Sequence, residues 1–183
     1  MNELIKKIER WSIDRDLHNA NPMKQYDKLV EEHGELVKGL NKQDEKLIKD
    51  SIGDMFVVIT IMAQQINGDM QEVMEHKDID VFEDADTLRF TMLLAYVGVN
   101  LKEGNIRLKA IGAKSWASNT DDYQIRKNLT ETEKILGALV NLLDKTAKAH
   151  GTDLKTCVQL AYDEIKDRKG EMRDGRFVKQ EDL

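Results

Sequence analysis

The sequence has few of the residues that end helices or cross-link chains. Its 183 residues include one proline, one cysteine and only 5% aromatic residues, whereas charged residues make up 34%. A single cysteine excludes an internal disulfide, and Cys157 falls on an apolar position of a helical pattern, which predicts a buried, inert thiol in a reducing compartment. Few prolines and aromatics with many charges favour an all-α protein over a sandwich or barrel.

Long apolar runs and an excess of positive charge are also lacking. The longest strongly apolar stretch, residues 55–62, is far shorter than the roughly 20 residues that cross a bilayer. The first residues, MNELIKKIERW, are amphipathic and lack the apolar core of a signal peptide. Lysine and arginine number 28 against 34 acids, so the net charge is -6, which disfavours nucleic acid as a partner. We expect a cytoplasmic protein with no membrane or nucleic-acid partner.

Apolar residues recur at helical spacing along most of the chain. The patterns predict helices over the first 11 or so residues and over about 23–40, 44–66, 85–103, 128–150 and 154–169, the last capped by Thr152 or Asp153. The stretch 55–62 is apolar on nearly all sides, so it must be buried all round in a core or a subunit interface. Residues 104–127 predict a polar connection with one short helix. We expect one helical domain over residues 1–183, with parts 1–69, 70–130 and 131–183.

The two halves of the chain are faintly similar. Residues 51–69 can be laid beside 135–153, and residues 26–41 beside 90–105. The alignment matches Gly53 with Gly137, Asp69 with Asp153, and Gly34 with Gly98. It replaces the acids Glu31, Glu32, Glu35 and Asp54 by Ala95, Tyr96, Val99 and Ala138. One interpretation is a degenerate second repeat that keeps the scaffold and loses the acids; the other is chance imitation between helical patterns.

Five acids gather on two successive predicted helices. With 3.6 residues per turn, Glu31 and Glu35 are about 40° apart around the helix, and Glu32 and Glu35 about 60°. Asp50 and Asp54 repeat the spacing of about 40° on the next helix. The simplest interpretation is a solvated acidic face, where like charges cost only about 0.2–0.5 kcal/mol per pair.

Two features favour a metal site over a solvated face. Asp54 directly precedes the apolar run, and Glu32 and Glu35 border the apolar stripe of their helix, so these acids should face another helix. Gly34 and Gly53 stand beside them at mid-helix positions, where glycine costs about 1 kcal/mol relative to alanine. Carboxylates drawn together into a helix interface must be protonated, paired or bridged by a cation. Oxygen ligands alone suit Mg²⁺ or Mn²⁺.

The segment KLVEEHGELVKGLNKQDEKLIKDSIGDMFVV resembles the signature of MazG-like nucleoside triphosphate pyrophosphohydrolases. This all-helical superfamily carries EExxE on one helix, matched here by Glu31, Glu32 and Glu35, and ExxD on the next, whose final acid is Asp54. Ser51 stands where the family has the glutamate of ExxD, so either Asp50 takes over as ligand or the metal site is weakened. The tail AYDEIKDRKGEMRDGRFVKQED is similar to that of small MazG-like proteins of phages and Gram-positive bacteria.

The resemblance implies a MazG-like helical bundle that cleaves a nucleoside triphosphate to its monophosphate and pyrophosphate with Mg²⁺ or Mn²⁺. The implied metal ligands are Glu32, Glu35, Asp50 and Asp54, and Glu31 would be a further ligand or the base. Basic residues that could bind phosphates are Lys28, Lys166, Arg168 and Lys169. Trp11 could stack on the base, although a tryptophan on an apolar stripe is usually core. The resemblance also implies a homo-oligomer, either a dimer or a tetramer.

Two other functions fit the sequence. A catalytically inactive helical scaffold that binds a protein partner would tolerate Ser51 in place of the acid. A related enzyme acting on dUTP or on a phosphoribosyl nucleotide would use the same metals with another pocket. No residue distinguishes among bases or sugars.

Overall fold

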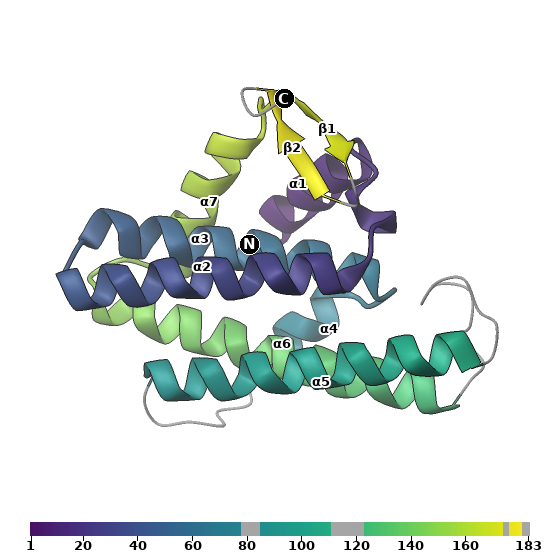
Figure 1. Ribbon diagram of the computed structural model, residues 1–183. Helices are drawn as coiled ribbons and strands as arrows, with labels where there is room; N and C mark the ends of the chain where they lie inside the picture. Colours follow the sequence, from purple (N-terminus) through teal and green to yellow (C-terminus); the bar gives the residue numbers. More distant parts are fainter. Residues whose placement is uncertain (78–84, 111–122, 174–175, 181–183) are drawn as a thin grey trace.

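The computed structural model describes residues 1–77, 85–110, 123–173 and 176–180. These residues form seven α-helices, one 3-10 turn and a two-stranded hairpin, so the helical prediction is confirmed (Figure 1). In chain order the elements are α1 (Asn2–Ile13), η1 (Leu17–Asn19), α2 (Pro22–Lys42), α3 (Glu45–Gln65), α4 (Met70–His76), α5 (Thr87–Ala110), α6 (Tyr123–Ala149), α7 (Leu154–Ile165), β1 (Gly170–Arg173) and β2 (Arg176–Lys179).

Short polar side chains set where the main helices begin. The Asn21 side chain accepts a hydrogen bond from the Met23 N–H at 2.9 Å, and Pro22 occupies the first turn of α2, where its missing N–H is not needed. Asp44 caps α3 in the same way. Asp153, one of the two predicted caps, accepts from the Thr156 N–H at 2.9 Å and begins α7.

Three predicted boundaries were wrong. Helix α5 continues to Ala110 and α6 begins at Tyr123, so much of the predicted connection 104–127 is helical; residues 111–122 lie outside the described part of the chain. Helix α4 was not predicted. The last helix ends at Ile165 instead of 169, and residues 170–173 pair with residues 176–179 as antiparallel strands. The Asp-Gly dipeptide between the two strands is a hairpin signal that helical periodicity does not register.

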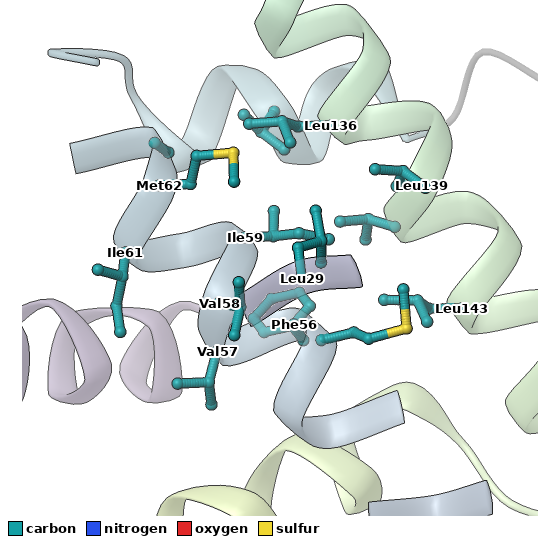
Figure 2. Packing of buried hydrophobic residues seen from close by; sticks show 14 of the residues in the cluster. Leu29, Phe56, Val57, Val58, Ile59, Ile61, Met62, Leu136, Leu139 and Leu143 are labelled. Atoms are coloured by element: carbon teal, nitrogen blue, oxygen red, sulfur yellow. The ribbon is translucent and has the colours of Figure 1, made fainter. Parts of the chain in front are cut away.

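Helix α3 runs through the middle of the core. Every residue from Met55 to Met62 is at most 6% exposed, which confirms the predicted burial on all sides. Figure 2 shows Ile59 and Met62 turned toward Leu136 and Leu139 of α6. Helices α1, α2 and α7 also pack against α3. The apolar stretch therefore finds its neighbours within one chain. None of the described helices is long and apolar enough to span a membrane.

Two glycines let helices approach closely in equivalent places. A Cβ on Gly53 of α3 would lie 2.3 Å from the Cys157 carbonyl oxygen of α7, and one on Gly137 of α6 would lie 2.7 Å from the Val73 carbonyl oxygen of α4. Gly137 follows Gly53 along the chain by the same number of residues as Cys157 follows Val73. The contact of α7 with α3 at Gly53 therefore corresponds, in the alignment of the two halves, to the contact of α4 with α6 at Gly137. This correspondence supports the internal repeat, which stays a prediction.

The glycines of the first half make a paired test of this packing. Gly53→Ala should lower the free energy of unfolding by about 2 kcal/mol, because the added methyl group overlaps the backbone of α7. Gly34→Ala should raise it by about 0.5–1 kcal/mol, because that position is an exposed helix interior with open space around it. Urea unfolding of both variants measures the two changes; equal effects would contradict the close contact at Gly53.

Candidate active site

A cavity of about 650 Å³ brings the predicted acids together. Its wall is built from α1, η1, α2, α3, the C-terminal end of α7 and the hairpin. All five acids named from the sequence line it: Glu31, Glu32, Glu35, Asp50 and Asp54. The helical spacing that placed them on common faces is therefore matched by the tertiary structure.

The register of α3 places Asp50, and not Ser51, at the cavity. Asp50 and Asp54, one turn apart, both line the cavity. Ser51 is 1% exposed and does not line it, and its hydroxyl has no hydrogen-bond partner among the described residues. Asp50, rather than the residue at position 51, thus presents its carboxylate beside Asp54.

Lys28 neutralises part of the acidic wall. Its ammonium lies 2.5 Å from a carboxylate oxygen of Glu32 and 3.2 Å from one of Glu31. Burial alone would lower the pKa of Lys28, but its hydrogen bonds to the two glutamates outweigh burial and raise that pKa. Glu32 is only 4% exposed, and burial raises its pKa despite the lysine. The ammonium of Lys28 is therefore engaged by acids rather than free for phosphate.

Among the cavity acids, Asp54 has the most strongly raised pKa. Burial, together with the charges of Glu32, Asp50 and Glu164, raises its pKa from 3.8 to about 7, against an opposing contribution from Arg168. Burial also raises the pKa of Asp50, with Glu164 and Glu35 adding to the effect. The cavity holds more negative charge than its own cations offset.

Glu164 is a cavity residue that the sequence reasoning did not identify. It and Arg168 stand one turn apart at the C-terminal end of α7 and form an ion pair with each other. The approach of α7 to α3 at Gly53 brings this pair to the acids. The only local signal was the acid-to-arginine spacing of four residues in the tail, which is common on any solvated helix.

Aromatic side chains also line the cavity. The Trp11 indole N–H donates to the Ile165 carbonyl at 2.8 Å, and its ring meets Phe177 edge-on with centroids 5.7 Å apart. The guanidinium of Arg15 lies 4.4 Å from the centre of the indole ring and donates to the Arg168 carbonyl at 2.8 Å. Trp11 is 8% exposed. It is thus a core residue that also lines the cavity, and β2 supplies the aromatic partner that the sequence did not predict.

Two of the predicted phosphate-binding residues lie elsewhere. Lys166 is paired with Asp163 at 2.7 Å, and neither Lys166 nor Lys169 lines the cavity. Of the predicted basic residues, the structure brings Lys28 and Arg168 to it, together with Lys24.

The acids share a cavity without forming a closed cage. Within the described ranges, no three histidine, cysteine, aspartate or glutamate side chains lie close enough together to hold one ion. The donors that face the cavity are nevertheless carboxylate oxygens, which suit a hard divalent ion. Burial first, and then the charges of neighbouring carboxylates, raise the pKa values of Glu32, Asp50 and Asp54, and a bound cation would offset both effects. The residues fit Mg²⁺ or Mn²⁺ in their chemistry.

The family comparison matches the part of the chain that carries the five acids. Residues 21–78 match the model of the MazG nucleotide pyrophosphohydrolase domain. A segment of 66 residues is 52% identical to an uncharacterized 18.2 kDa protein from the rep-hol intergenic region of Haemophilus phage HP1 (strain HP1c1). That segment covers 36% of this chain and 40% of the phage protein. No solved structure matched.

The raised pKa of Asp54 predicts how stability depends on pH in metal-free protein. The folded chain binds this proton more tightly than the unfolded chain, so the free energy of unfolding should fall as pH rises from about 4 to about 7. The variant Asp54→Asn lacks this ionisation. Its free energy of unfolding, minus that of wild type, should therefore increase by up to about 4 kcal/mol as pH rises over that range. Urea unfolding in EDTA at several pH values measures the difference; parallel curves would contradict the raised pKa.

Proposed function

We propose that this chain, whose residues 21–78 match the model of the MazG nucleotide pyrophosphohydrolase domain, hydrolyses a nucleoside triphosphate to the monophosphate and pyrophosphate. The observation that carries the proposal is the cavity of about 650 Å³, whose lining combines the five predicted acids with the aromatic side chains of Trp11 and Phe177. Its size lies within the roughly 300–1,000 Å³ of small-molecule sites. The acids suit a triphosphate with its metal, and the aromatic side chains suit a base.

Glu32, Glu35, Asp50 and Asp54 would hold Mg²⁺ or Mn²⁺, with Glu164 as an additional candidate from α7. The bound ion would supply charge neutralisation of the phosphates and a lowered pKa for a water molecule. Because these carboxylates repel one another in the free protein, ion binding would also relieve an existing cost.

The chemical step is a displacement at the α-phosphorus. A water oxygen bonds to this phosphorus, the bond to the bridging oxygen breaks, and pyrophosphate leaves with that oxygen. Glu31 is suited to accept the water's proton, because its side chain is exposed at the cavity wall. Its partner Lys28 also contacts Glu32, so one lysine links the proposed base to a proposed metal ligand.

Arg168, Lys24 and Lys28 would bind the phosphate oxygens. Arg168 is paired with Glu164, and Lys28 with Glu31 and Glu32, so a cation bound by the acids would free both basic groups for phosphate. The indole of Trp11 and the ring of Phe177 offer an apolar surface for a nucleobase. The rigid anchoring of Trp11 to Ile165 keeps this surface in place.

The predicted homo-oligomer belongs to this proposal as well. The stretch 55–62 is enclosed by helices of its own chain, so burial of this stretch does not require a second subunit. A contact between subunits would have to use another surface.

Pyrophosphate release from a panel of standard and modified nucleoside triphosphates, dUTP included, tests the activity. Wild type with Mg²⁺ or Mn²⁺ should release pyrophosphate and the monophosphate, and Glu35→Gln or Asp54→Asn should lower kcat by about 100-fold or more. Asp163→Asn is the matched control, because this acid of α7 lies outside the cavity and should leave the rate unchanged. No turnover of any nucleotide by folded wild type would favour the inactive scaffold.

Metal binding without substrate tests which residue replaces the missing acid. Asp50→Asn should weaken Mn²⁺ binding about 10-fold or more, because its carboxylate lines the cavity. Ser51→Ala should leave the affinity unchanged, because this hydroxyl is buried away from the cavity. Isothermal titration with Mn²⁺ measures both; the opposite order would show that position 51 still faces the ion.

A further inference from the structure

Gln25 of α2 has a buried side chain whose amide the fold leaves unpaired. The residue is only 9% exposed, and it lines the cavity of the candidate active site. Within the described part of the chain its amide has no hydrogen-bond partner, although neither the oxygen nor the nitrogen is sealed from solvent. Buried polar side chains are usually hydrogen-bonded, so an unpaired amide that opens into a cavity indicates a contact with a bound molecule.

A second buried glutamine shows what an amide does when it serves the fold. Gln65, 7% exposed at the end of α3, donates a hydrogen bond to the Leu17 carbonyl at 2.8 Å and so holds η1 against α3. Gln25 makes no such link. Loss of its amide would therefore remove no hydrogen bond from the described part of the folded chain, and the packing of that part does not account for this side chain.

Gln25 lies about two helical turns from the acids. It precedes Glu32 by seven residues, a spacing that keeps both on one face of α2 and separates them by a rise of about 10 Å. Helix α3 runs beside α2 in the opposite direction (Figure 1), and Ile61, which follows Asp54 by seven residues, also lines the cavity. The cavity thus extends from the acids by about two turns along both helices, a distance similar to the length of a nucleoside.

The other buried side chains that η1 and α3 bring to this cavity away from the acids are apolar. They are Leu17, Val57, Val58 and Ile61. Lys24 and Asp27, the neighbours of Gln25 on α2 that also line the cavity, are exposed. Gln25 therefore offers the cavity a buried, uncharged polar group in an apolar setting, which suits the edge of a flat, neutral ring better than a phosphate.

We propose that the Gln25 amide hydrogen-bonds the edge of the substrate's nucleobase and thereby determines which bases the site accepts. This inference rests on the proposed function, because it assigns a specificity-determining residue to the same cavity. An amide presents an acceptor oxygen beside a donor nitrogen, which matches a base edge that carries a donor beside an acceptor. With the phosphates and metal at the acids, the base lies about a nucleoside's length away, where Gln25 is, whereas the sugar lies nearer the acids.

Burial makes this contact selective. Water satisfies the amide in the free protein, and a base that displaces this water without replacing its hydrogen bonds leaves a buried polar group unpaired. Sites built to hydrogen-bond their substrate discriminate strongly against analogues that lack the matching atoms. Gln25 should therefore favour bases with an intact Watson–Crick edge over bases methylated at that edge.

Isothermal titration in Mg²⁺ tests the contact with uncleavable α,β-methylene analogues of the four nucleoside triphosphates. Each is paired with an edge-methylated form (N3-methyluridine, N1-methylguanosine, N6,N6-dimethyladenosine or N4,N4-dimethylcytidine), and inorganic triphosphate is the base-free probe. Wild type should bind its preferred analogue about 10-fold or more tighter than the methylated form. Gln25→Met, which keeps the length of the side chain, should remove most of this difference by weakening the unmethylated analogue, and should leave the affinity for inorganic triphosphate unchanged.

Gln71→Met is the matched control, because Gln71 is an exposed glutamine of α4 outside the cavity, and this variant should bind every analogue like wild type. Gln25→Met should also melt no lower than wild type, since it breaks no hydrogen bond among the described residues, whereas a glutamine needed for folding would lose stability. In turnover of the preferred nucleotide, Gln25→Met should raise KM with little change in kcat, because the base contact is the same in the ground state and the transition state.

Three results would overturn the base contact. They are a Gln25→Met variant with wild-type base selectivity, a wild type that binds inorganic triphosphate as tightly as every nucleotide, and a variant altered only in its preference between ribose and deoxyribose, which would assign the amide to the sugar. The binding measurements need no turnover, so a protein that binds the analogues selectively but hydrolyses no nucleotide would contradict the proposed function alone. A protein that binds none of the probes would contradict both.

Discussion

The close approach of α7 to α3 at Gly53 is the contact on which the site depends. With no side chain at this position, the backbone of α7 can lie directly against α3, and the next turns of α7 carry Glu164 and Arg168 to the acids of α2 and α3. The same approach puts the Ile165 carbonyl within hydrogen-bonding distance of the Trp11 indole, which holds α1 and the hairpin over the cavity. Because Gly53 has no side chain, α7, the acid-bearing helices α2 and α3, and α1 with the hairpin can all meet around the cavity.

Crowded negative charge is the second constraint. Apolar residues of α3, among them Val57 and Ile61, form part of the cavity wall and reduce the solvation of the neighbouring carboxylates, so the pKa values of Glu32, Asp50 and Asp54 rise together. Lys28 and Arg168 offset part of this charge, and each is itself held by an acid. A cavity in this state is suited to a divalent ion and its phosphate ligand, because an ion relieves the repulsion and frees the basic groups.

The two halves of the molecule show how one helical framework can present different chemistry. The alignment of the two halves matches the glycine contact of α3 with α7 to that of α6 with α4, and the cavity face of α2 to the outer face of α5, as the predicted internal repeat requires. Side chains that point away from a helix pair do not take part in its packing, so acids on the outer face of α2 and apolar residues on the outer face of α5 are both compatible with the same framework. The acidic face of α2 carries the proposed chemistry.

Local spacing was enough to predict every described helix except α4, the burial of residues 55–62 and the common faces of the acids, because these follow from the helical repeat alone. It also indicated Asp50 as the alternative to Ser51, since four residues make one turn. The sequence could not show that Glu164 joins these acids or that Lys166 points elsewhere, because both depend on how α7, more than 100 positions away, settles on α3. The hairpin and the exposure of apolar side chains on the outer face of α5 were likewise decided in three dimensions, since an apolar pattern indicates that a face prefers burial but not which neighbour covers it.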